Sequence, residues 1–352
     1  PEVDAVLGTT SYGDIVKALN EAQAGHVFQE FRDINELPED SGRRVLTTGG
    51  HFGYLKIAEG CDKHCTYCII PSLRGKFRSV PEERLLAQAE YMASQGVKEL
   101  ILVAQETTVY GTDLYGKKTL HILLKKLCQI KGIRWIRVLY CYPEEIYDEL
   151  IQVMKEEKKI CNYLDLPIQH ASDRILKRMG RRTTRKQLED IIAKLRREIP
   201  DIVLRTSLIT GFPGETQEDH EELMEFVDEM EFDRLGVFTY SPEEGTPAET
   251  MEGQVPEEVK EERRDELMSL QQEISLEKGD ERIGQELLVM IEGKVSGESA
   301  YIARTYADAP KVDGYIFVQT GELLVTGDFA RVRVTGALEY DLIGELADEY
   351  TE

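Results

Sequence analysis

The chain has 352 residues, 41% of them hydrophobic, which is enough to bury a large core and to form one large domain together with a small one. No stretch approaches eighteen consecutive apolar residues, and no basic segment followed by an apolar one opens the sequence, which argues against a membrane span or secretory signal and predicts a cytoplasmic protein. The net charge of −23 argues against a protein that works mainly by binding phosphate backbones; it favours a basic partner or simply serves solubility.

Residues 1–45 predict one strand, one helix and a polar connection, which is too little for a domain. The sequence starts at Pro1 rather than at a methionine. We therefore expect this segment to be the remnant of an N-terminal domain.

Residues 46–248 alternate short apolar runs with amphipathic segments, which is typical of βα units around a parallel sheet. Six strands are predicted, at 54–58, 99–105, 135–142, 163–169, 202–209 and 235–241. Pro81, Ser172 and Thr216 indicate where three of the intervening helices begin. The sequence thus predicts an α/β fold, an open partial (β/α)6 barrel.

Three cysteines fall within eight residues after the first predicted strand, in the sequence CDKHCTYC. Cys61, Cys65 and Cys68 have the spacing C-x3-C-x2-C, which lets one loop hold three irons of a cubane cluster and leaves the fourth iron open. Zinc with His64 as fourth ligand is the alternative, but His64 adjoins Cys65, and adjacent side chains seldom point at one tetrahedral centre. We therefore predict an iron-sulfur cluster.

Polar or glycine-rich segments follow three other predicted strands, namely QETT, QHAS and GFPGET. Ligands of parallel βα folds bind at the carboxyl ends of the strands, so we expect these segments to meet the cysteine loop at one rim. The remaining cysteines are spread along the chain and are predicted to be small buried hydrophobes: Cys128, Cys141 and Cys161.

The pattern changes twice after residue 248. Residues 249–282 predict a connecting loop and a long charged helix, and residues 283–352 alternate with a period of two between glycine turns, which predicts a small closed five-stranded barrel. This module has five basic and thirteen acidic residues, a net charge of −8. Its surface should repel RNA and attract a protein rich in Lys and Arg.

The segment IAEGCDKHCTYCIIPSLRG is similar to the cluster loop of radical S-adenosylmethionine (SAM) enzymes, and its end, PSLRG, resembles the methylthiotransferases among them. The resemblance runs from Tyr54 to the C-terminus. It implies a [4Fe–4S] cluster on Cys61, Cys65 and Cys68, whose open iron binds SAM, and one-electron cleavage of SAM to a 5′-deoxyadenosyl radical. Family members also need an electron donor and a sulfur donor, and their N-terminal domain holds a second [4Fe–4S] cluster on three cysteines that this sequence does not contain.

The resemblance assigns several side chains to SAM. Tyr67 would pack against the adenine, with a core aromatic as the alternative. Gln105 would accept the SAM amino group and Gln169 would face the same rim, unless either merely caps its loop. Ile209 and Gly211, in ITGFPGET, resemble the turn that approaches adenine and ribose, and an ordinary β-to-α turn is the alternative.

Arg205 and Ser207 alternate with apolar residues along the fifth strand, so both should point into the barrel. A charge there needs a partner, which is either the SAM carboxylate or an internal salt bridge. Arg74 and Arg78, beside the cluster loop, would steady a substrate carboxylate or form a solvated basic turn.

The terminal module resembles a TRAM domain, which binds RNA in tRNA-modifying relatives. Glu244, in YSPEEGTPA, stands where those relatives usually carry Pro, and ADAPKVDG and YDLIG resemble members that act on protein. The resemblance therefore implies an enzyme that adds a methylthio group to the β-carbon of an aspartate in small-subunit ribosomal protein twelve, and we expect it to be a monomer. The alternatives are a tRNA adenosine methylthiotransferase and a non-catalytic metal-binding adaptor for basic proteins.

Overall fold

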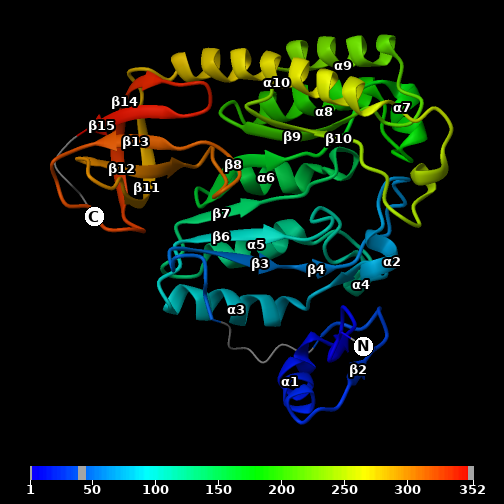
Figure 1. The fold of residues 1–352 in the computed structure, drawn as a ribbon. Coiled ribbons are helices and arrows are strands. Elements are labelled where there is room, and N and C mark those ends of the chain that lie inside the picture. Colours follow the sequence, from blue (N-terminus) through cyan, green and yellow to red (C-terminus); the bar gives the residue numbers. More distant parts are fainter. Residues whose placement is uncertain (1, 39–44, 348–352) are drawn as a thin grey trace.

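The computed structural model describes residues 2–38 and 45–347, and its main body is a six-stranded parallel sheet with the order β10-β9-β8-β7-β6-β3 (Figure 1). The strands are β3 (Phe52–Lys56), β6 (Glu99–Val103), β7 (Trp135–Val138), β8 (Ile160–Asp165), β9 (Val203–Thr210) and β10 (Arg234–Thr239). Neighbouring strands are parallel throughout. The predicted partial (β/α)6 barrel is therefore confirmed.

Helices cover the outer face of this sheet. They are α3 (Glu82–Ser94), α5 (Leu120–Cys128), α6 (Asp148–Glu156), α7 (Asp173–Arg178), α8 (Arg185–Glu198) and α9 (Gln217–Met230). The helix starts agree with the sequence, since α3, α7 and α9 begin directly after Pro81, Ser172 and Thr216. The Thr216 hydroxyl accepts a hydrogen bond from the backbone N–H of Asp219, and the Asp219 carboxylate accepts one from the backbone N–H of Thr216. These two hydrogen bonds form a capping box.

The strand predictions were wrong in extent at β7 and β8. β7 ends at Val138, before the predicted residue 142, because Tyr140 has a φ of 59° and leaves the extended conformation. β8 begins at Ile160 and ends at Asp165, and Gln169 further on has a φ of 74°. The apolar run alone did not reveal these left-handed residues.

Shorter elements connect the sheet to the loops at its carboxyl edge. They are β4 (Ala58–Glu59), α2 (Ile70–Arg74), β5 (Arg78–Ser79), α4 (Thr112–Tyr115) and two 3-10 turns, Pro143–Glu145 and Pro247–Thr250. β4 and β5 pair antiparallel and bracket the cysteine loop. This pairing closes the loop at its base.

The N-terminal segment holds β1 (Ala5–Leu7), a 3-10 turn (Tyr12–Asp14), α1 (Ile15–Gln23) and β2 (Phe28–Glu30). β1 pairs in parallel with β2, so this segment has two strands where the sequence predicted one. A strand of three residues is too short to give a periodic signal. Residues 39–44 of the predicted connection lie outside the described residues.

The C-terminal part consists of the long helix α10 (Glu257–Asp280) and a closed five-stranded barrel, as predicted. The barrel order is β11-β12-β13-β15-β14. Its strands are β11 (Glu286–Lys294), β12 (Ala300–Thr305), β13 (Ile316–Gln319), β14 (Phe329–Ala337) and β15 (Leu342–Leu346). Within the described residues, no helix is long and apolar enough to cross a membrane.

The β-barrel packs against the end of the sheet where the strands begin (Figure 1). The first residues of three strands, Phe52, Trp135 and Val203, share an apolar cluster with Ile101 of β6 and with barrel side chains such as Met290. The cysteine loop follows β4 at the opposite end of the sheet. The barrel therefore supports the sheet from the end remote from the loop.

Candidate active site at the carboxyl end of the sheet

The cysteine loop turns sharply as it leaves β4. Gly60 has a φ of 72°, and a Cβ at this position would collide with the carbonyl oxygen of Lys76. The Cys61 N–H donates to the Gly75 carbonyl at 3.2 Å, and Asp62 accepts from the Phe77 N–H at 3.1 Å. Glycine at residue 60 is therefore what lets the loop lie this close to the strand that follows it.

The three thiol groups of the loop lie within electrostatic range of one another. Cys61 and Cys65 are buried and Cys68 is half-buried. The Lys63 N–H donates to the Cys61 sulfur at 3.4 Å, and the Tyr142 hydroxyl lies 3.4 Å from the Cys65 sulfur. Burial raises the pKa of Cys61 to about 11 and also raises that of Cys68, so these thiols stay neutral unless a metal compensates the charge of the thiolate.

Among the described residues no three Cys, His, Asp or Glu side chains are gathered around one point as a ready metal-binding group. The chemistry of the donor set nevertheless fits an iron-sulfur cluster, since it consists of three thiols on one loop with a backbone N–H directed at a sulfur. His64 is exposed whereas Cys61 and Cys65 are buried, which disfavours the zinc alternative. The loop is therefore best suited to three-thiolate ligation.

Two acceptor oxygens at the end of β6 lack a partner in the described chain. They are Oε1 of Gln105 and Oε2 of Glu106, and both are buried. The other Glu106 oxygen accepts from the N–H of Thr108 at 2.9 Å and from its hydroxyl. Gln105 is one of the residues predicted from the sequence, whereas Glu106 is not, although both lie in the QETT segment. Unpaired acceptors of this kind suit an ammonium group such as that of SAM.

The Tyr67 ring lies between the cysteine loop and the glycine-rich turn. It contacts the Phe212 ring edge-on, with centroids 6.3 Å apart, and it packs with Ile209 in the same apolar cluster. This packing is what we expect of a core aromatic residue, which was the alternative to a role for Tyr67 at the adenine. Burial raises the pKa of Tyr67 well above its usual value, so its hydroxyl remains protonated.

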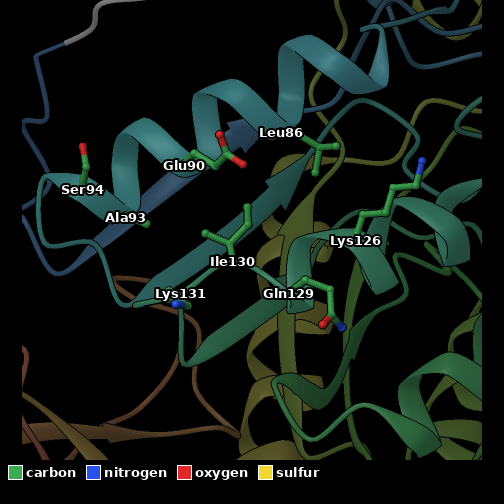
Figure 2. Close-up of a pocket in the computed structure, with 8 residues that line it drawn as sticks. All are labelled: Leu86, Glu90, Ala93, Ser94, Lys126, Gln129, Ile130 and Lys131. Atoms are coloured by element: carbon green, nitrogen blue, oxygen red, sulfur yellow. The ribbon is translucent and has the colours of Figure 1, made fainter.

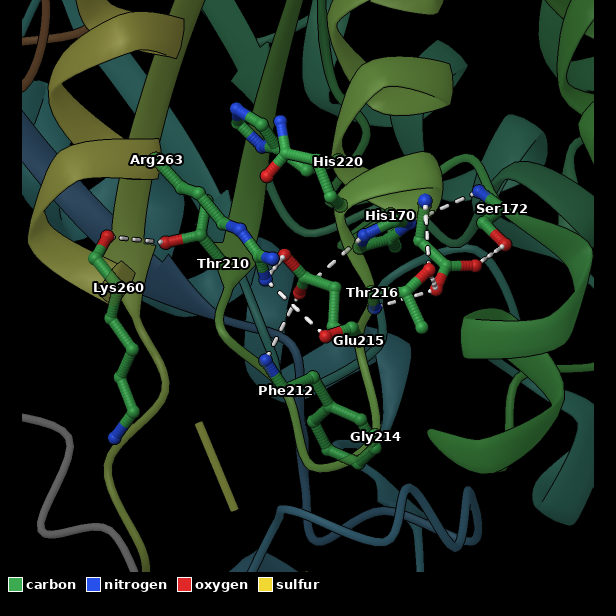
Figure 3. Close-up of polar contacts among 12 residues, drawn as sticks. His170, Ser172, Thr210, Phe212, Gly214, Glu215, Thr216, His220, Lys260 and Arg263 are labelled. Atoms are coloured by element: carbon green, nitrogen blue, oxygen red, sulfur yellow. Dashed lines mark hydrogen bonds and ion pairs between the residues drawn. The ribbon is translucent and has the colours of Figure 1, made fainter. Parts of the chain in front are cut away.

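The glycine-rich turn after β9 is fixed by α10 (Figure 3). Gly211 has a φ of 68°, and a Cβ there would collide with the Lys260 side chain. Glu215, fully buried, accepts from the Phe212 N–H at 3.0 Å and pairs with Arg263 at 2.9 Å. The turn is therefore anchored to the connecting helix through a buried ion pair.

His170 joins this network from the neighbouring strand end. Its Nδ1 accepts the backbone N–H groups of Ala171 and Ser172, each at 3.0 Å, so the ring proton of the neutral imidazole sits on Nε2. Nε2 lies 3.6 Å from the Glu215 carboxylate (Figure 3). His170 and Glu215 lie in QHAS and GFPGET, but the sequence did not indicate that they meet.

Gln169, directly before His170, continues the pairing of β8 with β9. Its N–H donates to the Ser207 carbonyl at 3.0 Å, and its carbonyl accepts from the Ile209 N–H at 2.8 Å. The structure therefore brings three predicted SAM residues, Gln169, Ser207 and Ile209, to one point on the rim.

Arg205 is engaged in internal ion pairs. It lies 2.7 Å from Asp165 at the end of β8 and 3.3 Å from Asp313, which belongs to the β-barrel. Its Nη1 is 3.4 Å from the Ser207 hydroxyl. Arg205 therefore forms the internal salt bridge that was the alternative to binding the SAM carboxylate. The sequence did not indicate that Asp313 of the β-barrel would be one of its partners.

The predicted substrate residues come from three segments: Arg74 ends α2, Arg78 begins β5, and Glu244 follows β10. Arg78 donates to the Arg74 carbonyl at 3.0 Å and to that of Lys76, and burial lowers the pKa of its guanidinium. Glu244 is exposed. The segment after it is tied to the loop, since the Ala248 N–H donates to the Thr66 carbonyl at 2.9 Å.

The surface has a hollow on the outer helices and a groove beside the edge strand β3, and the two lie at different distances from the cysteine loop along the chain. A shallow hollow of about 560 Å³ between α3 and α5 is lined by Leu86, Lys126 and their neighbours and lies on the outer helical layer (Figure 2). A groove of about 900 Å³ lies between the N-terminal segment and the edge strand β3, and Glu59, two residues before Cys61, lines it. Through Glu59 the groove comes within two residues of the cysteine loop along the chain, whereas none of the residues that line the hollow belongs to the rim.

Comparison with known proteins agrees with this geometry. The radical SAM superfamily model matches residues 55–227, and the TRAM domain model matches residues 283–347. A protein of Lachnoclostridium phytofermentans named ribosomal protein uS12 methylthiotransferase RimO is 62% identical over 344 residues, which cover 98% of this chain and 78% of that protein. Proteins of the same name from Clostridium botulinum and Clostridium perfringens are 48% and 50% identical, over 100% and 99% of this chain and 79% and 78% of theirs. The chain belongs to the radical SAM superfamily and, within it, to the RimO family of methylthiotransferases.

Proposed function

We propose that this protein adds a methylthio group to ribosomal protein uS12, at the β-carbon of an aspartate. The observation that carries the proposal is the loop of three thiols at the carboxyl end of a parallel sheet, in a chain that is 62% identical to a uS12 methylthiotransferase over nearly its whole length. That C–H bond is not acidic enough for polar chemistry, so a radical mechanism is needed.

Cys61, Cys65 and Cys68 would hold a [4Fe–4S] cluster, which when bound supplies the electron that cleaves SAM to a carbon radical. The chain's own residues bind and orient SAM. The unpartnered oxygens of Gln105 and Glu106 would accept its ammonium group, and the turn at Gly211 would let the backbone approach its adenosine part.

The neighbouring rim residues complete the proposed SAM site. Tyr67, packed between the cysteine loop and this turn, would bound the adenine. Gln169, Ser207 and Ile209 lie together beside it. We assign Arg205 mainly to holding the rim, because Asp165 and Asp313 already pair with its charge.

A substrate loop would enter through the groove beside β3. Basic and acidic side chains line it, among them Arg32, Lys56, Arg84 and Glu59. The groove lies at the open edge of the partial barrel, since β3 has a strand neighbour on one side only. Arg74 and Arg78 stand by the cysteine loop and would steady the carboxylate of the target residue, while Glu244 would face a basic partner.

The acidic β-barrel is the feature that favours protein over tRNA as substrate. Some of its thirteen carboxylates are not free to meet a partner, because Asp308 and Asp313 pair with Arg234 and Arg205 of the sheet. Exposed carboxylates such as Glu298 and Glu322 remain. They still oppose a nucleic acid and suit a basic ribosomal protein.

The test is a mass measurement on uS12. Anaerobically reconstituted protein that also carries the upstream domain implied by the family resemblance should, with SAM, a reductant and a sulfur source, add the mass of one methylthio group to uS12, at an aspartate. Transfer to tRNA adenosine and not to uS12 would establish the alternative. Release of 5′-deoxyadenosine separates an enzyme from a metal-binding adaptor. A second cluster, if supplied by an upstream domain as the family resemblance implies, would provide the sulfur.

A further inference from the structure

Arg181 is a buried cation beside the cysteine loop, and none of the roles proposed above uses it. Its side chain is 1% exposed. The guanidinium carbon lies 4.2 Å from the centroid of the Tyr142 ring, and the Tyr142 hydroxyl lies 3.4 Å from the Cys65 sulfur. Arg181 thus stacks on the very residue that contacts a cluster ligand.

The chain holds Arg181 there through several independent contacts with the cysteine loop. The Thr66 N–H donates to the Met179 carbonyl at 2.9 Å, and the Thr66 hydroxyl donates to the Arg178 carbonyl at 2.8 Å. Gly180 has a φ of 73°, and a Cβ there would come within 2.8 Å of the His64 carbonyl oxygen. The end of α7 is therefore locked against the loop, and Arg181 follows directly.

The charge of Arg181 is poorly compensated. Its Nη2 donates to the Pro167 carbonyl at 3.2 Å, but Nε and Nη1 are buried and have no hydrogen-bond partner within the described part of the chain. The nearest carboxylate oxygen, Oε2 of Glu144, is 3.8 Å away and is itself without a hydrogen bond.

Lys63, a cation within the loop itself, differs in this respect. Its ammonium pairs with Glu145 through a hydrogen bond, and Lys118 lies 2.8 Å from the same carboxylate. Of these two cations, Arg181 is therefore the one that lacks an equal counter-charge. Desolvation makes such a charge costly unless an anion comes to meet it.

We propose that Arg181 is the counter-charge of the bound iron-sulfur cluster and raises its reduction potential. The proposal rests on the proposed function only in that the cysteine loop holds the cluster. Reduction adds one electron to a group already anionic through three thiolates, and a buried positive charge stabilises the more negative, reduced form. Net charge and hydrogen bonds to sulfur are the protein's main means of setting such a potential.

The test is a redox titration of the reconstituted protein, followed by the electron paramagnetic resonance signal of the reduced cluster, without SAM or uS12. Arg181→Gln should lower the ratio of reduced to oxidised cluster at a fixed potential at least tenfold, which is about 59 mV for a one-electron couple. Glu144→Gln, which removes the opposing charge, should raise that ratio. Arg182→Gln, at the exposed neighbouring residue, is the matched control and should change nothing.

The two substitutions near the loop shift the potential in opposite directions, which a merely structural role would not do. Glu144 makes no hydrogen bond through Oε2, so Glu144→Gln keeps the measurement valid even where Arg181→Gln loads no iron. Unchanged potentials in protein with normal iron content, or a fall in Glu144→Gln, would overturn the proposal. If the unaltered protein bound no cluster, the proposed function would fail instead, and iron analysis distinguishes the two cases.

Discussion

The Arg304 guanidinium, on β12 of the barrel, lies 2.7 Å from the carboxylate of Glu99, the first residue of β6, and both side chains are fully buried. Glu99 also pairs with Arg137 at 2.8 Å, and Arg304 pairs with Glu292 at 2.6 Å. The two guanidiniums lower the pKa of Glu99 despite its burial, so it remains ionised. One carboxylate therefore joins the sheet to the barrel.

Glu99→Gln should destabilise the protein by about 3–5 kcal/mol, because it leaves two buried guanidiniums facing a neutral amide. Glu286→Gln is the control, since Glu286 pairs with Arg333 at the surface and should contribute about 1 kcal/mol or less. Chemical unfolding of the metal-free protein measures both. Equal losses in the two variants would contradict a structural role for the buried pair.

Because Arg304 of the β-barrel pairs with the buried Glu99 carboxylate, we also expect that removing residues 283–352 unfolds the sheet and does not leave it active.

Cys61→Ala, Cys65→Ala and Cys68→Ala should each abolish iron binding and SAM cleavage after reconstitution, because a cubane with two protein thiolates loses an anchor and its defined open iron. The unaltered chain should bind about four irons. Cys128→Ala, Cys141→Ala and Cys161→Ala serve as controls, since these side chains are buried in the apolar cores. Iron analysis decides, and a need for any of the control cysteines would show that the ligand assignment is wrong.

Glu215→Gln should weaken SAM binding about tenfold, the equivalent of about 1.4 kcal/mol, and leave kcat for 5′-deoxyadenosine release nearly unchanged. The substitution removes the charge that ties Arg263 and the Phe212 N–H together, so the turn at Gly211 loses its anchor. Arg264→Gln is the control, since Arg264 is one residue along α10, is only half-buried and pairs with Asp265 instead of with the turn. A fall in kcat without a change in KM would argue that Glu215 acts in the chemistry instead of in positioning.

Burial raises the pKa of Glu106 to about 7. The folded protein then binds more protons than the unfolded chain between about pH 4.5 and pH 7, so stability falls as the pH rises through this window, and the loss is complete above it. Glu106→Gln should therefore be more stable than the parent at pH 8, by on the order of 2–3 kcal/mol, and no more stable below pH 4.5. Thermal unfolding of the metal-free protein across this range is the measurement, and a gain that is independent of pH would contradict the pKa shift.

The glycine and cysteine positions show how much of the site could be predicted from sequence. Gly60 and Gly211 both have the left-handed conformation at a close approach, as glycine in a turn suggests. The three loop cysteines and the segments after β6, β8 and β9 lie at the carboxyl edge as expected. Within those segments, however, Glu106, His170 and Glu215 were passed over, because nothing local distinguishes a polar residue that points into a network from one that caps a loop.

The sequence by itself determined the six βα units, the starts of three helices, the five-stranded barrel and the cysteine loop, because each depends on periodicity, spacing or a local residue signal within one segment. Tertiary structure decided which charges meet. Arg205 turned inward as its strand period requires, but its partner Asp313 comes from the β-barrel. Arg181 reached Tyr142 and the cysteine loop only through the packing of α7. A buried charge needs a counter-charge wherever the fold can bring one, and residues distant in sequence supply it only after the segments have packed.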